Sequence, residues 1–169
     1  MKVGIIGYSG CGKTTFFNAL TGLTIETQGK TGRLNLREVK VPDPRVDKLV
    51  DIFHPRSTVY TSIQLADIPG QAPGSGGGFD AQFIAKMREM ELLVVVVRAF
   101  DDPYSPDAPR PAGEAADMLA ELLLADLSVI ERKLERMRKE HDKGQERELI
   151  QRLQQALEAE TWLSELELN

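Results

Sequence analysis

Residues 7–14 have the residue types and the spacing needed to bind a chain of phosphates. They read GYSGCGKT and fit the pattern G-x-x-x-x-G-K-[S/T] in full. Glycines let the backbone N–H groups of such a loop turn toward phosphate oxygens, and the helix that follows adds partial positive charge. Lys13 would reach the β- and γ-phosphates, and the Thr14 hydroxyl would coordinate magnesium. The residues expected to contact the nucleotide are Gly7, Ser9, Gly10, Cys11, Gly12, Lys13, Thr14 and Thr15, with the side chains of Tyr8 and Cys11 pointing away.

A second short motif, Asp67-Ile68-Pro69-Gly70, fits D-x-x-G and ends an apolar segment. Asp67 would hold magnesium through a water molecule, and the N–H of Gly70 would meet the γ-phosphate. Gain or loss of that contact would move the glycine-rich loop behind it, as in nucleotide-dependent switches. The alternative is an ordinary turn at the end of a strand.

Two further positions are candidates for the chemistry beside these motifs. Gln71 follows D-x-x-G directly, where a glutamine orients the attacking water in Ras-like GTPases; a solvent-facing loop glutamine is the alternative. Lys13 and Gln71 are therefore the catalytic candidates. A switch threonine that binds magnesium should lie between the two motifs, where Thr24, Thr27 and Thr31 all qualify. We take Thr27 as the candidate metal ligand, although the sequence does not choose well among the three.

The elements that would position these motifs alternate between strands and helices. The segment at 92–97 is apolar on both faces, which is typical of a central parallel strand. Asp43 can cap a helix whose first residue is Pro44 and whose apolar residues share one face. The pattern predicts an α/β fold, that of a P-loop NTPase with a mostly parallel sheet. Strands are expected at residues 3–6, 33–41, 57–66 and 92–97, and helices at 13–20, 79–90 and from Pro44 onward.

The composition changes after Arg98. Residues 101–113 carry four prolines and are typical of a linker. Apolar residues then repeat in heptads along a long helix at 114–140, and Gly144 separates it from a second helix at 146–168. Two such helices would form an antiparallel hairpin like a coiled coil. We therefore expect a nucleotide-binding domain at 1–100, a linker at 101–113 and a helical hairpin at 114–169.

The overall composition sets limits on the class of protein. The chain has 169 residues and a net charge of -5, which argues against general nucleic-acid binding through charge alone. The single cysteine cannot form an internal disulfide and suits a reducing cytoplasm. The longest apolar run, at 92–97, is far below the roughly 20 residues that cross a bilayer. A cytoplasmic protein without a membrane-spanning segment is expected.

Several longer stretches resemble the YchF or Obg-like ATPase family. They occur in the same order as in that family and run through nearly the whole chain. The resemblance implies a P-loop GTPase-class fold with the hairpin inserted in the nucleotide-binding domain, magnesium, hydrolysis of ATP or GTP, and a role near the ribosome. The matching stretches are VPDPRVDKL at 41–49, DIPG at 67–70, MRE at 87–89, VVVVRAF at 94–100, LLLADL at 122–127 and ERKLER at 131–136.

The chain also departs from that family. The family usually has Pro-Asn-Val inside the phosphate loop, where this chain has Ser9-Gly10-Cys11, and an apolar residue where this chain has Gln71. No N/T-K-x-D motif or related base-recognition motif is present. We therefore expect an incomplete G domain, from either a fragment or a shortened relative, with residues 92–97 forming an apolar edge that recruits a second copy or another partner.

Two functions from different classes follow. The first is a switch protein that binds a guanine or adenine nucleotide with Mg²⁺ and hydrolyses it slowly. The second is a nucleotide-binding interaction module with little turnover, whose base-recognition half is missing or supplied by a partner. In either case the hairpin could dock on the ribosome or on a protein. A different P-loop enzyme, such as an ABC-type ATPase or a small-molecule kinase, would need motifs that the chain does not contain.

Overall fold

The computed structural model describes residues 1–22, 34–71, 79–103, 107–140 and 144–166. These residues form two compact units. One is built from the described residues of 1–76 and 80–111, and the other from those of 77–79 and 112–169. The first unit contains the sheet and the second contains the two long helices, so each is considered separately.

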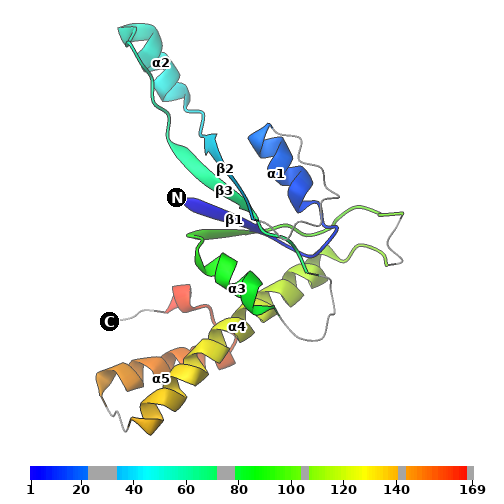
Figure 1. Cartoon of the computed structure of the whole chain (residues 1–169), viewed down its shortest axis with the longest axis vertical. Coiled ribbons are helices and arrows are strands. Elements are labelled where there is room, and N and C mark those ends of the chain that lie inside the picture. The colour runs from blue at the N-terminus through cyan, green and yellow to red at the C-terminus, as the bar shows by residue number, and fades with distance from the viewer. Residues whose placement is uncertain (23–33, 72–78, 104–106, 141–143, 167–169) are drawn as a thin grey trace. The chain divides into compact units, whose positions relative to one another are not determined.

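A four-stranded sheet forms the centre of the first unit (Figure 1). Its order is β2-β3-β1-β4, in which β1 pairs in parallel with both β3 and β4, and β2 is antiparallel to β3. This confirms the predicted α/β fold with a mostly parallel sheet. The strands are β1 (Lys2–Ile6), β2 (Asn35–Lys40), β3 (Ser62–Asp67) and β4 (Leu92–Val95).

The helix after the phosphate loop covers one face of the sheet. Strand residues alternate between faces, and Val3 and Ile5 of β1 point to the same side as Leu65 of β3. Phe17 of α1 (Lys13–Thr21) packs among them and is completely buried. Gly22 ends the helix in the left-handed conformation that suits glycine. The core of this unit therefore lies directly behind the phosphate loop and holds its helix in place.

The opposite face of β1 packs closely on the segment between α3 and β4. A Cβ atom at Gly4 would lie 2.7 Å from the Met90 side chain, so any other residue there would displace Met90. Helix α3 (Ala81–Arg88) begins at Asp80, whose side chain accepts a hydrogen bond from the N–H of Phe83 at 2.7 Å. Phe83 and Met87 are the buried residues of this helix. Backbone hydrogen bonds from the N–H of Glu91 to Lys2 and from the N–H of Val96 to Ile6 join the two ends of β4 to β1.

Helix α2 (Pro44–Phe53) lies at the end of the ribbon formed by β2 and β3, away from α1 (Figure 1). It begins as predicted, because the Asp43 carboxylate accepts a hydrogen bond from the N–H of Arg45 at 2.9 Å. Its amphipathic pattern is also present, yet no residue of α2 is buried. Leu49 is 53% exposed and Phe53 is 72% exposed. We refer to residues 41–61 as the α2 arm.

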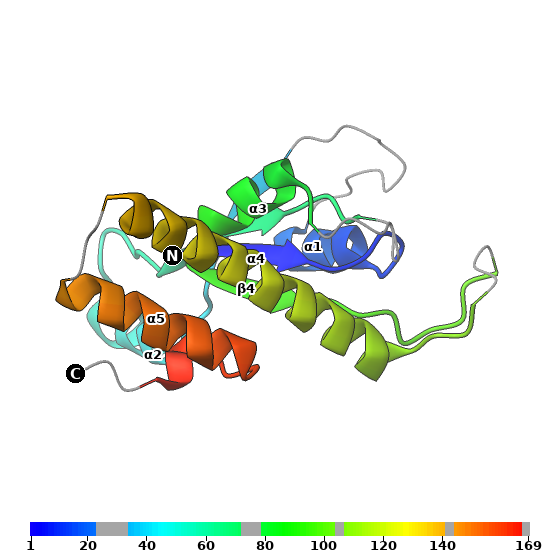
Figure 2. The ribbon, with the colours of Figure 1, turned by 90° about the horizontal axis from the view of Figure 1, so that it is seen from below.

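The second unit is a pair of helices that run side by side (Figure 2). They are α4 (Pro111–Lys139) and α5 (Gln145–Glu158), and an ion pair of 2.7 Å joins Lys133 to Glu146 near the turn. Helix α4 begins at Pro111, so the last three residues of the expected linker belong to its first turn. Proline suits that turn because it has no N–H to leave unpaired. Within the described ranges, no helix has the length and apolar character needed to cross a membrane.

The second helix of this pair ends ten residues earlier than predicted. Glu160 has a φ of 56°, and the N–H of Thr161 reaches back to the carbonyl of Ala156 at 2.9 Å. This bond and that from the N–H of Glu160 to Leu157 form a Schellman motif, which closes α5. The leucines that continued the periodic pattern lie instead around a short 3-10 helix, η1 (Leu163–Glu165). Periodicity alone did not reveal this stop because no glycine or proline marks it.

Candidate phosphate-binding site

The phosphate loop joins the carboxyl end of β1 to the first turn of α1. Its glycines are required for two different reasons. At Gly7 a Cβ atom would lie 2.2 Å from the carbonyl oxygen of Val96, so no side chain fits. Gly10 and Gly12 have φ values of 80° and 97°, which other residues rarely adopt. The loop is therefore pressed against the end of β4 and curved in the way that a nest of backbone N–H groups requires.

Lys13 is buried at the centre of this loop, with only 6% of its surface exposed. Its Nζ donates a hydrogen bond to the Tyr8 carbonyl at 2.7 Å and lies 3.8 Å from the Sγ of Cys11. In the described part of the chain no carboxylate pairs with this ammonium group. A buried cation without a counter-charge is costly, so the loop is suited to an anionic ligand.

Thr14 and Asp67 bring the two sequence motifs together. The Thr14 hydroxyl donates a hydrogen bond to Oδ2 of Asp67 at 2.9 Å, across 53 residues of sequence. Asp67 is 5% exposed, and its Oδ1 has no hydrogen-bond partner. A buried carboxylate oxygen that is free and a hydroxyl beside it are hard oxygen donors of the kind that Mg²⁺ prefers. The residues present therefore fit a magnesium ion.

The D-x-x-G segment lies directly on the phosphate loop. A Cβ atom at Gly70 would be 2.4 Å from Nζ of Lys13 and 2.5 Å from the carbonyl oxygen of Gly7. One residue later, the carbonyl of Gln71 accepts a hydrogen bond from the N–H of Ser9 at 2.8 Å. Both Gly70 and Gln71 are thus brought to the loop.

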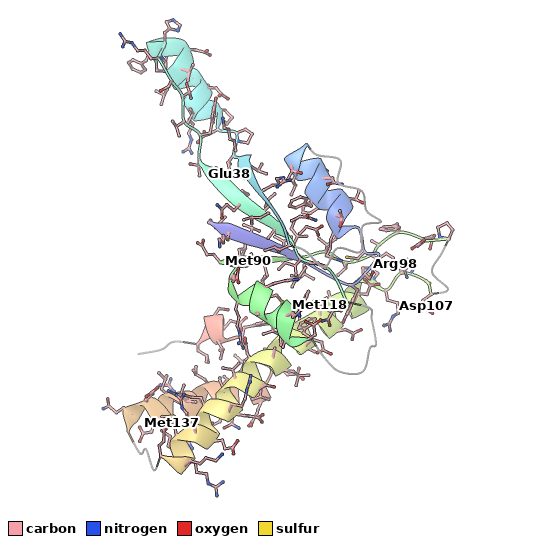
Figure 3. All side chains as sticks on the ribbon, viewed as in Figure 1. Glu38, Met90, Arg98, Asp107, Met118 and Met137 are labelled. Carbon is pink, nitrogen blue, oxygen red and sulfur yellow. The ribbon has the colours of Figure 1, made fainter. Side chains whose placement is uncertain are left out.

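Phe100 is a neighbour of the site that lies outside both sequence motifs. Its ring is 51% exposed, and it is the group nearest to a Cβ atom built at Gly12, at 3.8 Å. Just before it, the Arg98 guanidinium donates to the carbonyl of Asp107 at 2.7 Å; Figure 3 labels both residues. Phe100 could have been found from its position, because residues that follow parallel strands gather at the ligand-binding edge of a sheet.

The remaining sequence candidates are Thr15 and the switch threonines. Thr27, the proposed switch threonine, lies outside the described residues, as do Thr24 and Thr31. Thr15 is exposed on the first turn of α1. Among the residues with a described position, no three or more His, Cys, Asp or Glu side chains cluster in a way that could hold a metal ion.

Comparison with known proteins agrees with this geometry. A family profile described as 50S ribosome-binding GTPase matches residues 2–155. The chain is 36% identical over 151 residues to the ribosome-binding ATPase YchF of Escherichia coli O157:H7, which covers 85% of this chain and 42% of that protein. It is 31% identical over 173 residues to the Bacillus subtilis protein of the same name, covering 95% and 47%.

A solved structure, that of the Schizosaccharomyces pombe YchF GTPase, superposes with a TM-score of 0.79 and 25% sequence identity. The superposition covers 100% of this chain and 50% of that one. The chain thus spans about half the length of the relatives that it matches. With a family profile matched over most of its length and the phosphate loop described above, the chain belongs to the 50S ribosome-binding GTPase family and is YchF-like.

Proposed function

We propose that the chain is a nucleotide-dependent switch protein that binds GTP or ATP with Mg²⁺ and hydrolyses it slowly. The observation that carries the proposal is the Lys13 ammonium, 6% exposed and without a carboxylate partner in the described chain. A triphosphate is the anion for which the spacing of this loop is suited. Relatives named as a ribosome-binding ATPase and as a GTPase support the same activity.

Hydrolysis of this kind depends on positioning and charge neutralisation rather than on a covalent intermediate. Lys13 and the loop amides would hold the β- and γ-phosphates. The Gly70 N–H would bind the γ-phosphate, and the Gln71 side chain would orient the attacking water. These roles are compatible because Gly70 and Gln71 both lie against the loop that carries Lys13.

Magnesium would be held by the Thr14 hydroxyl and, through water, by Asp67. The free Oδ1 of Asp67 supports this assignment, since a buried carboxylate oxygen normally has a partner. When bound, the ion would neutralise charge on the β- and γ-phosphate oxygens. Thr27 remains the candidate for a further ligand on the basis of the sequence.

Phe100 is the candidate platform for the base. Its half-exposed ring beside Gly12 offers an aromatic face next to the phosphate loop. Stacking of a base on such a ring contributes about 1–3 kcal/mol and does not distinguish guanine from adenine, because both present the same kind of π-face. Selectivity would therefore come from groups other than Phe100.

The second candidate function is a nucleotide-binding interaction module with little turnover, acting in the cytoplasm on the ribosome or on a protein. A groove of about 310 Å³ between α4 and α5 supports a docking role for the hairpin.

We expect Leu134→Lys, inside this groove, to weaken co-sedimentation with 50S subunits by about tenfold or more, and Leu124→Lys, on the exposed surface of α4, to have little effect. Equal effects would reject the groove as the docking site. Its lining residues are Glu131, Leu134, Glu135, Arg138, Arg147, Gln151 and Gln154.

A homodimer through the edge strand at 92–97 is a further proposal about partners. In the described sheet, β4 lies at one edge and pairs only with β1, and Leu92 is 49% exposed. Such an apolar edge tends to pair with another strand. Sedimentation equilibrium over a range of concentrations tests this, and a monomer throughout would reject it.

The main proposal is tested by titration calorimetry with GDP, GTP, ADP and ATP in the presence of Mg²⁺. We expect Lys13→Ala to lose at least about 100-fold in affinity, because it removes a charged hydrogen-bond donor to phosphate. Lys48→Ala is the matched control, since Lys48 is an exposed lysine on the α2 arm. Its affinity should stay within about twofold of the wild type, because exposed surface substitutions have small effects.

The pattern of affinities then separates the two candidate functions. A preference for one base, with turnover of its triphosphate, supports the switch. Equal and weak affinities without turnover favour the interaction module, with base recognition supplied by a partner. Absence of binding by any of the four nucleotides would reject both nucleotide-dependent functions.

A further inference from the structure

The peptide group between Tyr8 and Ser9 bridges Lys13 and the segment after D-x-x-G. Its carbonyl accepts a hydrogen bond from the Nζ of Lys13 at 2.7 Å, and its N–H donates to the carbonyl of Gln71 at 2.8 Å. The two bonds lie on opposite sides of one planar peptide group, which makes a continuous chain from Lys13 to Gln71. Bonds in such a chain polarise and strengthen one another.

The bond to Gln71 depends on which residue stands at position 9. A proline has no N–H and could not donate it. Serine at position 9 supplies this N–H, and the acceptor is the main-chain carbonyl of residue 71. The bond therefore depends on the residue type at position 9 and not on that at position 71.

From this geometry we infer that the Ser9 N–H is a positioning group for hydrolysis: it fixes the backbone of Gln71 against the phosphate loop and so aims its side chain at the attacking water. The inference rests on the hydrolysis and on the Gln71 role proposed above. The Gly70 backbone, which packs against Lys13 and Gly7, fixes the same segment from the other side. Because the main-chain carbonyl of Gln71 is held by this bond, the position of its side chain depends only on the side-chain rotamer.

The test compares two substitutions at one position. Ser9→Pro removes the N–H, whereas Ser9→Ala keeps it and removes only the hydroxyl, so the alanine variant is the reference. Relative to Ser9→Ala, we expect Ser9→Pro to lower the single-turnover hydrolysis rate by about tenfold or more, because a misplacement of about 1 Å in a positioned group can cost about 100-fold. Nucleotide affinity should differ by less than about threefold between the two variants, because the Ser9 N–H donates to the Gln71 carbonyl rather than to phosphate, and the bond from Lys13 to the Tyr8 carbonyl remains.

A second pair in the Gln71→Ala background gives a readout that a purely structural role would not give. If Ser9 acts through Gln71, the difference in rate between proline and alanine at position 9 should fall below about twofold in that background. A difference in rate of the same size in the Gln71→Ala background would overturn the inference. Equal rates of the Ser9→Pro and Ser9→Ala variants in chains that keep Gln71 would overturn it too. A loss of affinity as large as the loss of rate would also overturn it, because the proline would then act on the phosphate loop itself.

Two controls keep failure of this inference distinct from failure of the proposed function. No turnover by the wild-type chain, or no effect of Gln71→Ala alone, would reject the proposed hydrolysis or the Gln71 role and with it this inference. Normal Gln71-dependent turnover with no effect at Ser9 would reject this inference alone. If circular dichroism shows that the proline variant does not fold, replacing Ser9 by its α-hydroxy analogue removes the same N–H without a ring, and the same comparison applies.

Discussion

The carboxyl edge of the sheet and the α2 arm contain similar residue types in opposite surroundings. Phe17 is completely buried behind the phosphate loop, whereas Phe53 of α2 is 72% exposed. Lys13 is 6% exposed within the loop, whereas Lys48 stands in solvent on the arm. Helices α1 and α2 both begin where the sequence predicts, and the exposed helix, α2, is the one that has a side-chain cap. What differs is whether a second layer of structure covers the apolar face.

This difference separates two kinds of sequence signal. The phosphate-loop pattern specifies that its residues are enclosed, because the lysine, glycines and threonine can bind a ligand only when the backbone curves around it. The apolar pattern of α2 specifies a helix with two unlike faces, but does not specify that one face is covered by the same chain. The two regions should therefore respond differently to matched substitutions.

The largest difference should appear in a matched pair of phenylalanines. Phe17→Ala removes a ring that is completely buried in the core, and we expect it to lower the free energy of unfolding by about 4 kcal/mol. Phe53→Ala removes an exposed ring and should cost less than about 0.5 kcal/mol. Urea denaturation of the two variants measures both values. Equal costs would mean that the α2 face is covered in solution and that the comparison fails.

Within the phosphate loop, two glycines should respond differently to the same change. Gly7→Ala places a methyl group 2.2 Å from the carbonyl oxygen of Val96, a backbone atom that cannot easily move, and should cost about 3 kcal/mol. Gly10→Ala meets no atom within 4 Å, and its cost of about 1 kcal/mol comes from the left-handed φ of 80°. Thermal unfolding of the two variants measures which substitution lowers the stability more. The reverse order would show that conformation rather than contact limits the loop.

The smallest effect concerns the α2 arm and is read as a titration. The Tyr60 hydroxyl donates to Oδ1 of Asp47 at 2.5 Å, and this bond to a carboxylate raises the pKa of the phenol above its ordinary 10.0. The bond therefore stabilises the arm at pH values below 10 and is lost as pH rises through the raised pKa. Asp47→Asn should bring this pKa down toward the ordinary value. Phenolate absorbance, with Tyr60→Phe as the blank for the other tyrosines, measures the shift.

Most of the fold and the centre of the site could be predicted from the sequence. The pattern G-x-x-x-x-G-K-[S/T] located the loop that surrounds Lys13, and the D-x-x-G position anticipated that Asp67 would meet Thr14. The end of α5 at Glu160 was not predicted, because a glutamate in the left-handed region ends the helix through backbone bonds alone. For Phe100, the place after a parallel strand indicates the ligand-binding edge, but its approach to Gly12 depends on how β4 pairs with β1, which no local pattern records.

The burial of Cys11 has a practical consequence for labelling. It is the single cysteine of the chain and is 3% exposed within the phosphate loop. A second cysteine placed on the α2 arm, for instance at Val59, which is 87% exposed, would react with a maleimide dye far faster than Cys11. The wild-type chain should therefore react only slowly with thiol-specific dyes. A single engineered cysteine would suffice to follow the arm by fluorescence as nucleotides or ribosomes are added.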